Sequence, residues 1–260
     1  MEDNKTMVYK YYAPTDYNLD ALLNQYFWFS KRSNLNDPYE MNTQILETFP
    51  KFRDLLNNRG YDIDNYHKKV DEYAICSFTS SCDNQHFWSL YAQNFEGWCL
   101  EFNCDNLVDS KKGVINKLYD VVYLDEVPDL DDDNVQIPIY KDECGNTITM
   151  PIAGLLRDTK EAEKLFEYLL CIKNREIWES EKEKRLVLGD IYLKQHGKND
   201  KNGYIVKWYK EALSRIIIGH KILDLKRKLI VLIAKELNVE VWEAKPDLKD
   251  RKFSIQINKI

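Results

Sequence analysis

The sequence has few of the residues that common nucleotide-binding loops and metal sites require. It contains nine glycines in 260 residues and neither a G-x-G-x-x-G nor a P-loop pattern, which argues against a glycine-rich phosphate cradle. The four histidines, His67, His86, His196 and His220, are scattered without metal-ligand spacing. No Ser-His or Cys-His signature of nucleophilic catalysis is present. These absences exclude the most familiar histidine-, cysteine- and glycine-based sites.

The chain also lacks long apolar runs and paired cysteines. No run reaches the ~18 apolar residues of a membrane-spanning helix, and the opening "MEDNKTMVYKYY" lacks the apolar core of a secretory signal. The six cysteines form no C-x-x-C pair, and four of them lie in or beside aromatic, strand-like segments. We therefore expect buried free thiols in a cytoplasmic protein with no membrane association.

A broad basic face is missing as well, because the formal net charge is -6. A protein that holds a nucleic-acid backbone through many phosphate contacts normally carries excess positive charge. The composition leaves room only for a small local basic groove.

Hydrophobic residues make up 44% of the chain and aromatic residues 13%, enough to bury a large core. The chain opens as a strand near residues 7–14, a helix over 15–25 capped by Asp or Asn, and a strand over 26–30. Later helices and strands are mixed without a regular repeat, which favours an α+β fold. We expect one compact domain over residues 1–260, with a mixed, mainly antiparallel sheet and peripheral helices. A helical insertion near 41–73 and an acidic loop with a hairpin near 125–152 interrupt it.

The stretch "IWESEKEKRLVLG" changes from charged to apolar at its middle. As a helix it would hold only an i,i+4 pair between Glu181 and Arg185, which stabilises by roughly 0.3 kcal/mol. As a strand it would place Glu181, Glu183 and Arg185 on one face, where the guanidinium keeps a neighbouring carboxylate ionised. The apolar residues 186–188 follow without helical spacing. We therefore predict that the long helix of residues 159–176 ends and that a strand begins around Glu181 or Glu183.

Two further stretches carry polar or flat side chains. "NDPYE" is typical of a turn, yet it also gathers Asn36, Asp37 and Glu40 at the end of a strand, where loops often hold ligand-binding groups. In "FWSLYAQNFEGWCLEF" the aromatic residues fall at helical spacing typical of core. The functional alternative is that Trp88 or Tyr91 lines a cleft as a stacking surface.

These stretches, with "YKYY" at the start and "SRIIIG" near the end, resemble the bacterial family known as domain of unknown function 2971 over nearly the full chain. The motifs of that family match Tyr9-Lys10-Tyr11, Phe29-Ser30, Asn36-Asp37-Pro38-Glu40, Trp88-Ser89-Tyr91-Ala92, Gly97-Cys99-Leu100 and Trp178-Glu181-Glu183-Arg185. The resemblance implies that these residues, distant in sequence, form one cleft.

A looser similarity concerns layout, which resembles the ADP-ribosyltransferase fold. That resemblance implies that Glu183 is the catalytic carboxylate, that Ser30 and Tyr11 line the nicotinamide side, and that Arg185 positions Glu183 or a phosphate. Asn36 and Asp37 would hold ribose or the acceptor. The first strand departs from the familiar pattern because it has no His-Gly pair. The complete set of predicted site residues is Glu183, Glu181 and Arg185 for catalysis and Tyr9, Tyr11, Ser30, Asn36, Asp37, Glu40, Trp88 and Tyr91 for binding.

The expected function is therefore that of an NAD-consuming, ADP-ribosyltransferase-like toxin or phage-defence effector, with NAD as substrate and no structural cofactor. Its partners would be a protein or nucleic-acid acceptor and an antitoxin or another defence-system protein. One alternative is a metal-dependent phosphodiesterase that uses Asp37, Glu40, Glu181 and Glu183 as oxygen ligands. Another is a non-catalytic interaction or sensor protein in which the same residues form a structural network.

Overall fold

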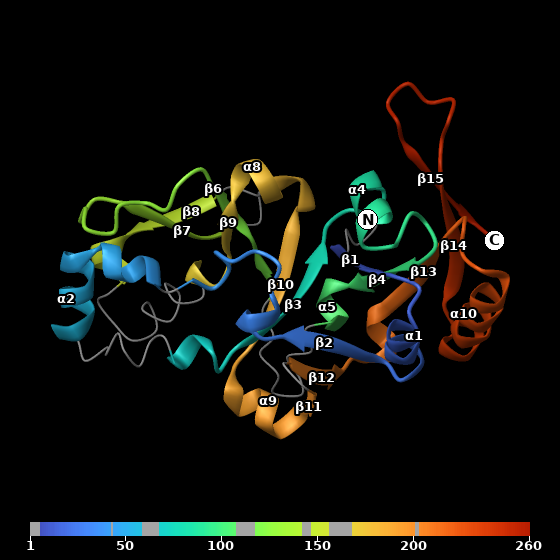
Figure 1. Ribbon diagram of the computed structural model, residues 1–260, viewed down its shortest axis with the longest axis horizontal. Helices are drawn as coiled ribbons and strands as arrows, with labels where there is room; N and C mark the ends of the chain where they lie inside the picture. The colour runs from blue at the N-terminus through green and yellow to red at the C-terminus, as the bar shows by residue number, and fades with distance from the viewer. Residues whose placement is uncertain are drawn as a thin grey trace.

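Among the residues that the computed structural model describes, which are 6–42, 44–58, 68–107, 118–141, 147–155, 168–200 and 203–260, eleven strands form one large sheet (Figure 1). Its path runs β11-β12-β2-β3-β1-β4-β13-β14-β15, with β10 and β5 attached beside β3. Every pairing is antiparallel except that of β13 with β14. Its strands are β1 (Met7–Tyr12), β2 (Tyr26–Ser30), β3 (Ala74–Thr79), β4 (Trp98–Asn103), β5 (Leu118–Asp120), β10 (Glu183–Leu188), β11 (Lys198–Asp200), β12 (Gly203–Lys207), β13 (Leu213–Gly219), β14 (Glu240–Pro246) and β15 (Ile255–Lys259).

Two small sheets and short helices surround this sheet. β6 (Val122–Leu124) pairs in parallel with β9 (Ile172–Asn174), and β7 (Gln136–Lys141) forms a hairpin with β8 (Thr147–Pro151). The hairpin and α2 lie at the opposite end of the molecule from α10 and β15 (Figure 1). The helices are α1 (Asp16–Leu23), α2 (Pro50–Asn58), α4 (Gln85–Leu90), α5 (Cys104–Leu107), α6 (Ile152–Leu155), α8 (Arg175–Trp178), α9 (Asp190–His196) and α10 (Asp224–Leu237), with 3-10 turns η1 (Arg32–Asn34), η2 (Gln44–Thr48), η4 (Glu179–Glu181) and η5 (Lys210–Ala212).

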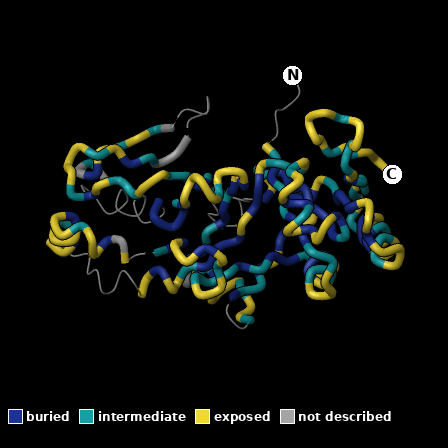
Figure 2. The backbone as a smooth tube through the Cα atoms, turned by 45° about the horizontal axis from the view of Figure 1, so that its top comes forward, coloured by how far each residue is buried: buried dark blue, intermediate teal, exposed yellow. Residues whose placement is uncertain are grey.

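Strand alternation divides the core between the two faces of the large sheet. On β13, Ile216 and Ile218 point to the face that α10 covers, where they join Ile230 of the helix. Ile217 points to the other face and joins Trp88 of α4. A separate apolar cluster forms around α2 and the β7–β8 hairpin. Figure 2 shows buried backbone through the centre of the large sheet and exposed backbone at the β14–β15 turn.

The large sheet forks at β3. One edge of β3 pairs with β10 along its full length, from Ala74 to Thr79. The other edge pairs with β1 only at Thr79, opposite Tyr9, and with β2 only at Ile75, opposite Ser30. β1 and β2 therefore diverge beside the middle of β3. This divergence opens the space in which the candidate site lies.

The α+β class with a mixed, mainly antiparallel sheet is confirmed, and the strands predicted at residues 7–14, 26–30 and around Glu183 are present. All five cysteines in the described ranges are free, as predicted. Within those ranges, no helix combines the length and the apolar character that a membrane span needs.

Three details of the prediction are wrong. Thr15, not Asp or Asn, caps α1, because its hydroxyl accepts a hydrogen bond from the Asn18 amide at 3.2 Å. The stretch "LYDVVYLDEV" at 118–127 predicts a single strand, but it forms two strands, β5 and β6, which belong to different sheets. The helix predicted to reach residue 176 ends before β9, because the parallel pairing with β6 overrides its helical pattern. Residues 159–167 of that helix, like the hairpin turn at 145–146, lie outside the described ranges.

Candidate functional site

A cleft of about 340 Å³ opens at the fork of the large sheet. β1 supplies one wall, the loop after β2 supplies the opposite wall, and β3 and β10 supply the floor. An aromatic rim comes from α4 and the turn after it. The residues that line the cleft are Tyr9, Lys10, Tyr11, Ser30, Asn34, Leu35, Asn36, Glu40, Ser77, Phe78, Phe87, Tyr91, Lys173, Glu181 and Glu183.

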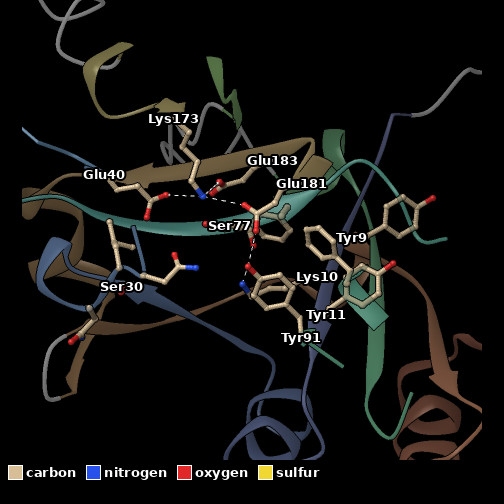
Figure 3. Close-up of a pocket in the computed structure, with 15 residues that line it drawn as sticks. Tyr9, Lys10, Tyr11, Ser30, Glu40, Ser77, Tyr91, Lys173, Glu181 and Glu183 are labelled. Carbon is tan, nitrogen blue, oxygen red and sulfur yellow. Dashed lines mark hydrogen bonds and ion pairs between the residues drawn. The ribbon is translucent and has the colours of Figure 1, made fainter. Parts of the chain in front are cut away.

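A buried ammonium group holds three carboxylates together at one end of the cleft. The Lys173 Nζ lies 3.0 Å from a carboxylate oxygen of each of Glu40, Glu181 and Glu183 (Figure 3). The four residues come from the loop after β2, from β9, from η4 and from β10. All are at least 90% buried. The Lys173 charge therefore links the loop after β2 to the neighbouring segments β9, η4 and β10, which are far from that loop in the sequence.

Arg185 lies behind this group and completes it. Its Nε donates to Glu183 Oε1 at 2.7 Å, its Nη2 donates to Glu183 Oε2 at 3.0 Å, and its Nη2 also contacts Glu40. The remaining amine, Nη1, donates to the Leu170 carbonyl at 2.8 Å. Arg185 is fully buried and does not line the cleft. Three carboxylates and two cations leave the cluster with one formal negative charge.

The two cations control the ionisation of Glu183. Burial alone would raise the pKa of Glu183, but Arg185, Lys173 and a hydrogen bond from Ser77 together lower it from 4.5 to about 2. Burial would likewise lower the pKa of Lys173, but Glu183, Glu40 and Glu181 raise it above its ordinary value. Glu183 is therefore an ionised carboxylate, and Lys173 an ammonium ion, over the whole physiological pH range.

Local backbone geometry sets Glu181 apart from the strand that carries Glu183. Glu181 ends η4, and Lys182 then takes a left-handed conformation with φ of 45° before β10 begins. The Thr79 hydroxyl fixes this turn by donating to the Glu181 carbonyl at 2.7 Å. The prediction that Glu181, Glu183 and Arg185 share one strand face is therefore wrong for Glu181. The turn nevertheless directs its carboxylate back to Lys173.

A second left-handed residue stands beside Glu40. Met41 is buried and has φ of 52°, a conformation that L-residues rarely adopt. Such strain, which costs of order 1 kcal/mol, persists only where the surrounding structure enforces it, and it gathers at functional sites. Met41 and Lys182 thus flank the carboxylates from two different segments.

Aromatic residues form the rim that faces these carboxylates. The Tyr91 hydroxyl donates to Glu181 Oε1 at 2.7 Å and also bonds Asn36 (Figure 3). Burial, followed by the hydrogen bond to Glu181, raises the pKa of Tyr91. The Phe87 ring lies 4.9 Å from that of Tyr91 and 5.1 Å from that of Tyr11, measured between centroids. A flat ring can therefore be held against aromatic side chains close to a fixed carboxylate.

An adjoining hollow of about 590 Å³ extends the cleft along β1. It shares Lys10, Tyr11 and Tyr91 with the cleft and adds Tyr17 and Trp28 among its walls. The Lys10 Nζ donates to the Ser77 carbonyl at 2.9 Å, across the fork. A cation therefore stands at the junction of two hollows that together suit an elongated ligand.

The structure brings eight of the eleven predicted site residues to the cleft: Tyr9, Tyr11, Ser30, Asn36, Glu40, Tyr91, Glu181 and Glu183. Arg185 lies behind them. Trp88 does not line the cleft, because it is fully buried and stacks on Phe95 at 5.2 Å. Asp37 also turns away, and its carboxylate accepts a hydrogen bond from the Tyr39 amide at 2.9 Å.

Sequence reasoning missed Lys173, Lys10 and Ser77. Lys173 was hidden because it falls within the predicted long helix, although a lysine directly after the apolar run "YLLCI" is a usable signal for a buried cation. Lys10 belongs to the matched Tyr9-Lys10-Tyr11 motif. It was missed because alternate residues of a strand point to opposite faces, so the pattern separates Lys10 from the two tyrosines. Ser77 becomes accessible only because β1 and β2 diverge beside it.

The carboxylates are not arranged as a metal site. An ammonium nitrogen occupies the point that Glu40, Glu181 and Glu183 share, and Asp37 is not among them. In the part of the chain that the structure describes, no group of three His, Cys, Asp or Glu residues could hold a metal ion.

Residues 87–186 match the model of a family described as Protein of unknown function (DUF2971). The resemblance read from the motifs is thus confirmed over this segment, which runs from α4 into β10 and contains Tyr91, Lys173, Glu181, Glu183 and Arg185. No curated protein and no solved structure matches the chain significantly.

Proposed function

We propose that the cleft binds NAD and that the protein transfers ADP-ribose from it, as a toxin or phage-defence effector acting on a protein or nucleic-acid acceptor. The observation that carries this proposal is the ionised Glu183, with a pKa of about 2, at the floor of a cleft with aromatic walls. The proposal includes the expected similarity between the order of strands and helices in this chain and that of the ADP-ribosyltransferase fold.

Breaking the bond between nicotinamide and ribose passes through a cation-like sugar. The electron pair of that bond leaves with neutral nicotinamide, and an acceptor nucleophile bonds to the anomeric carbon and gives up its proton. A fixed carboxylate stabilises the developing charge without reorganising. Glu183 has this role, and the net negative charge of its cluster adds to it.

Other groups of the cleft are suited to positioning. Tyr11, Phe87 and Tyr91 offer surfaces on which the nicotinamide ring stacks. Asn36 and Ser30 line the same space and supply polar groups for ribose hydroxyls or the amide. Lys10, at the junction with the larger hollow, is placed to meet the pyrophosphate. Arg185 acts through Glu183 and does not touch the ligand, because it is fully buried.

One observation favours a non-catalytic alternative. Both oxygens of Glu183 already contact cations, an arrangement that a purely structural polar network would also have. In that case the cleft belongs to an interaction or sensor protein. The metal-dependent phosphodiesterase alternative is disfavoured, because the Lys173 ammonium occupies the point that a shared cation would need.

The test is incubation of the protein with NAD labelled in its ADP-ribose and nicotinamide parts, with and without a chelator. We expect nicotinamide release that is insensitive to the chelator and falls at least ~100-fold in Glu183→Gln. Glu243→Gln, which alters an Arg-paired carboxylate outside the cleft, is the matched control and should keep full activity. Absence of both release and transfer at high enzyme concentration would refute the proposal. A folded Glu183→Gln protein with unchanged activity would remove Glu183 from the mechanism.

A further inference from the structure

A second pocket, of about 340 Å³, lies beside the cleft and takes no part in the proposed chemistry. We call it the Trp178 pocket. It lies among α8, the paired strands β6 and β9, and the loop after Asn36. Its apolar walls are Leu124, Val127, Ile172, Ile177 and Trp178. All of these residues belong to the described part of the chain.

Lys173 separates this pocket from the cleft. The residue lines both, but its side chain is only 3% exposed. Its ammonium group points to the three glutamates of the cleft and lies 4.2 Å from the centre of the Trp178 ring. The positive charge of Lys173 is therefore matched on the cleft side. The Trp178 pocket is a site of its own rather than an extension of the cleft.

Apart from Lys173, the charged residues of the pocket lining are acidic. Asp37, Asp125 and Glu126 line it, and Asp37 is 96% buried. Outside the lining, Arg175 lies 3.5 Å from Asp125 in an exposed pair that contributes little. The pocket thus combines an aromatic wall, aliphatic walls and an excess of negative charge.

We infer that the Trp178 pocket binds an arginine side chain presented by a protein partner. A guanidinium group is planar and weakly hydrated, stacks on aromatic rings and pairs with carboxylates, while its aliphatic stem suits apolar walls. Tyr39 and Ile177 are 74% and 65% exposed at the same place and offer the rest of the partner an apolar contact. The acidic lining selects this occupant over an acyl chain or an anionic ligand.

The experiment is a ligand-observed NMR titration of the full chain with N-acetyl-arginine methylamide. The same compound built on citrulline, which keeps the shape but loses the charge, is the comparison ligand. We expect saturable binding of the arginine compound and about fivefold weaker binding of the citrulline compound. Trp178→Ala and Glu126→Gln should each weaken binding about two- to fivefold. Trp242→Ala, which removes a half-buried tryptophan 4.7 Å from Arg215 elsewhere, is the matched control and should leave binding unchanged.

Equal binding of the two compounds, or no saturable binding at tens of millimolar, would overturn the inference. If Trp178→Ala does not fold, as judged by circular dichroism, Glu126→Gln alone decides, because Glu126 is exposed. Unchanged binding of the arginine compound to Glu126→Gln would then overturn the inference, because the acidic lining would not contribute to binding. The titration contains no NAD, so its failure is independent of the proposed transferase activity.

Discussion

Replacing Lys173 by Met tests whether the buried ammonium organises the carboxylate cluster. The substitution keeps the side-chain volume but removes the charge that lies 3.0 Å from each of Glu40, Glu181 and Glu183. The cluster then keeps three buried carboxylates and one cation, Arg185, which contacts Glu183 and Glu40. Removing one partner of a buried ion pair costs about 3–5 kcal/mol, because it leaves uncompensated charge.

The variant should also acquire a characteristic pH dependence. In the wild type, the pKa of Glu183 is lowered, so its stabilising contribution is full above 4.5 and is lost as the pH falls through about 2. In Lys173→Met, the crowded carboxylates repel one another, which raises the pKa of at least one of them above its ordinary value. The folded variant then binds more protons than its unfolded chain. Its deficit in unfolding free energy should therefore be largest at pH 7 and smaller at pH 5.

Urea unfolding followed by tryptophan fluorescence at pH 7 and pH 5 measures both effects. Lys184→Met is the matched control, since Lys184 lies on β10 but pairs with Asp120 near the surface, and it should cost less than about 1 kcal/mol. The double variant Lys173→Met/Glu181→Gln restores the net charge of the cluster and should recover part of the loss. Wild-type stability of Lys173→Met at pH 7, or a deficit that does not change with pH, would refute this account of the cluster.

Three other substitutions test the cleft and its supports. Gly97→Ala should destabilise by at least about 1–3 kcal/mol in urea unfolding, because a Cβ there would lie 2.0 Å from the Tyr12 carbonyl oxygen; wild-type stability would contradict the close approach. Tyr91→Phe should lower nicotinamide release about tenfold and unfolding free energy by only about 1 kcal/mol, since it removes the hydrogen bond to Glu181; an unchanged rate would remove Tyr91 from the mechanism. Trp88→Ala should cost about 3–5 kcal/mol in thermal and urea unfolding, as expected for a core residue, whereas a stable variant would indicate a surface role.

Much of the fold follows from local sequence pattern. β2 was predicted with its observed bounds, and β10 was predicted from the apolar residues that end "KRLVLG". β9 was not, because "CIKN" continues a helical pattern and becomes a strand only through its pairing with β6. Long-range pairing of this kind leaves little trace in the periodicity of a short segment.

The candidate site was predictable to a similar extent. Glu181, Glu183 and Arg185 were identified from their spacing, although the turn at Lys182 was not foreseen. Lys173, the common partner of Glu181 and Glu183, was missed, because its role depends on three carboxylates brought together by the fold. Trp88 shows the opposite case, in which a motif residue turns out to be core.

The measurement that tests the central claim most directly is a crystal structure of the protein with a non-cleavable NAD analogue. The account predicts that the nicotinamide ring stacks on Tyr11 or Tyr91, that the attached ribose lies beside the Glu183 carboxylate, and that the pyrophosphate approaches Lys10. An analogue bound elsewhere, or a cleft that stays empty at saturating analogue concentration, would contradict it.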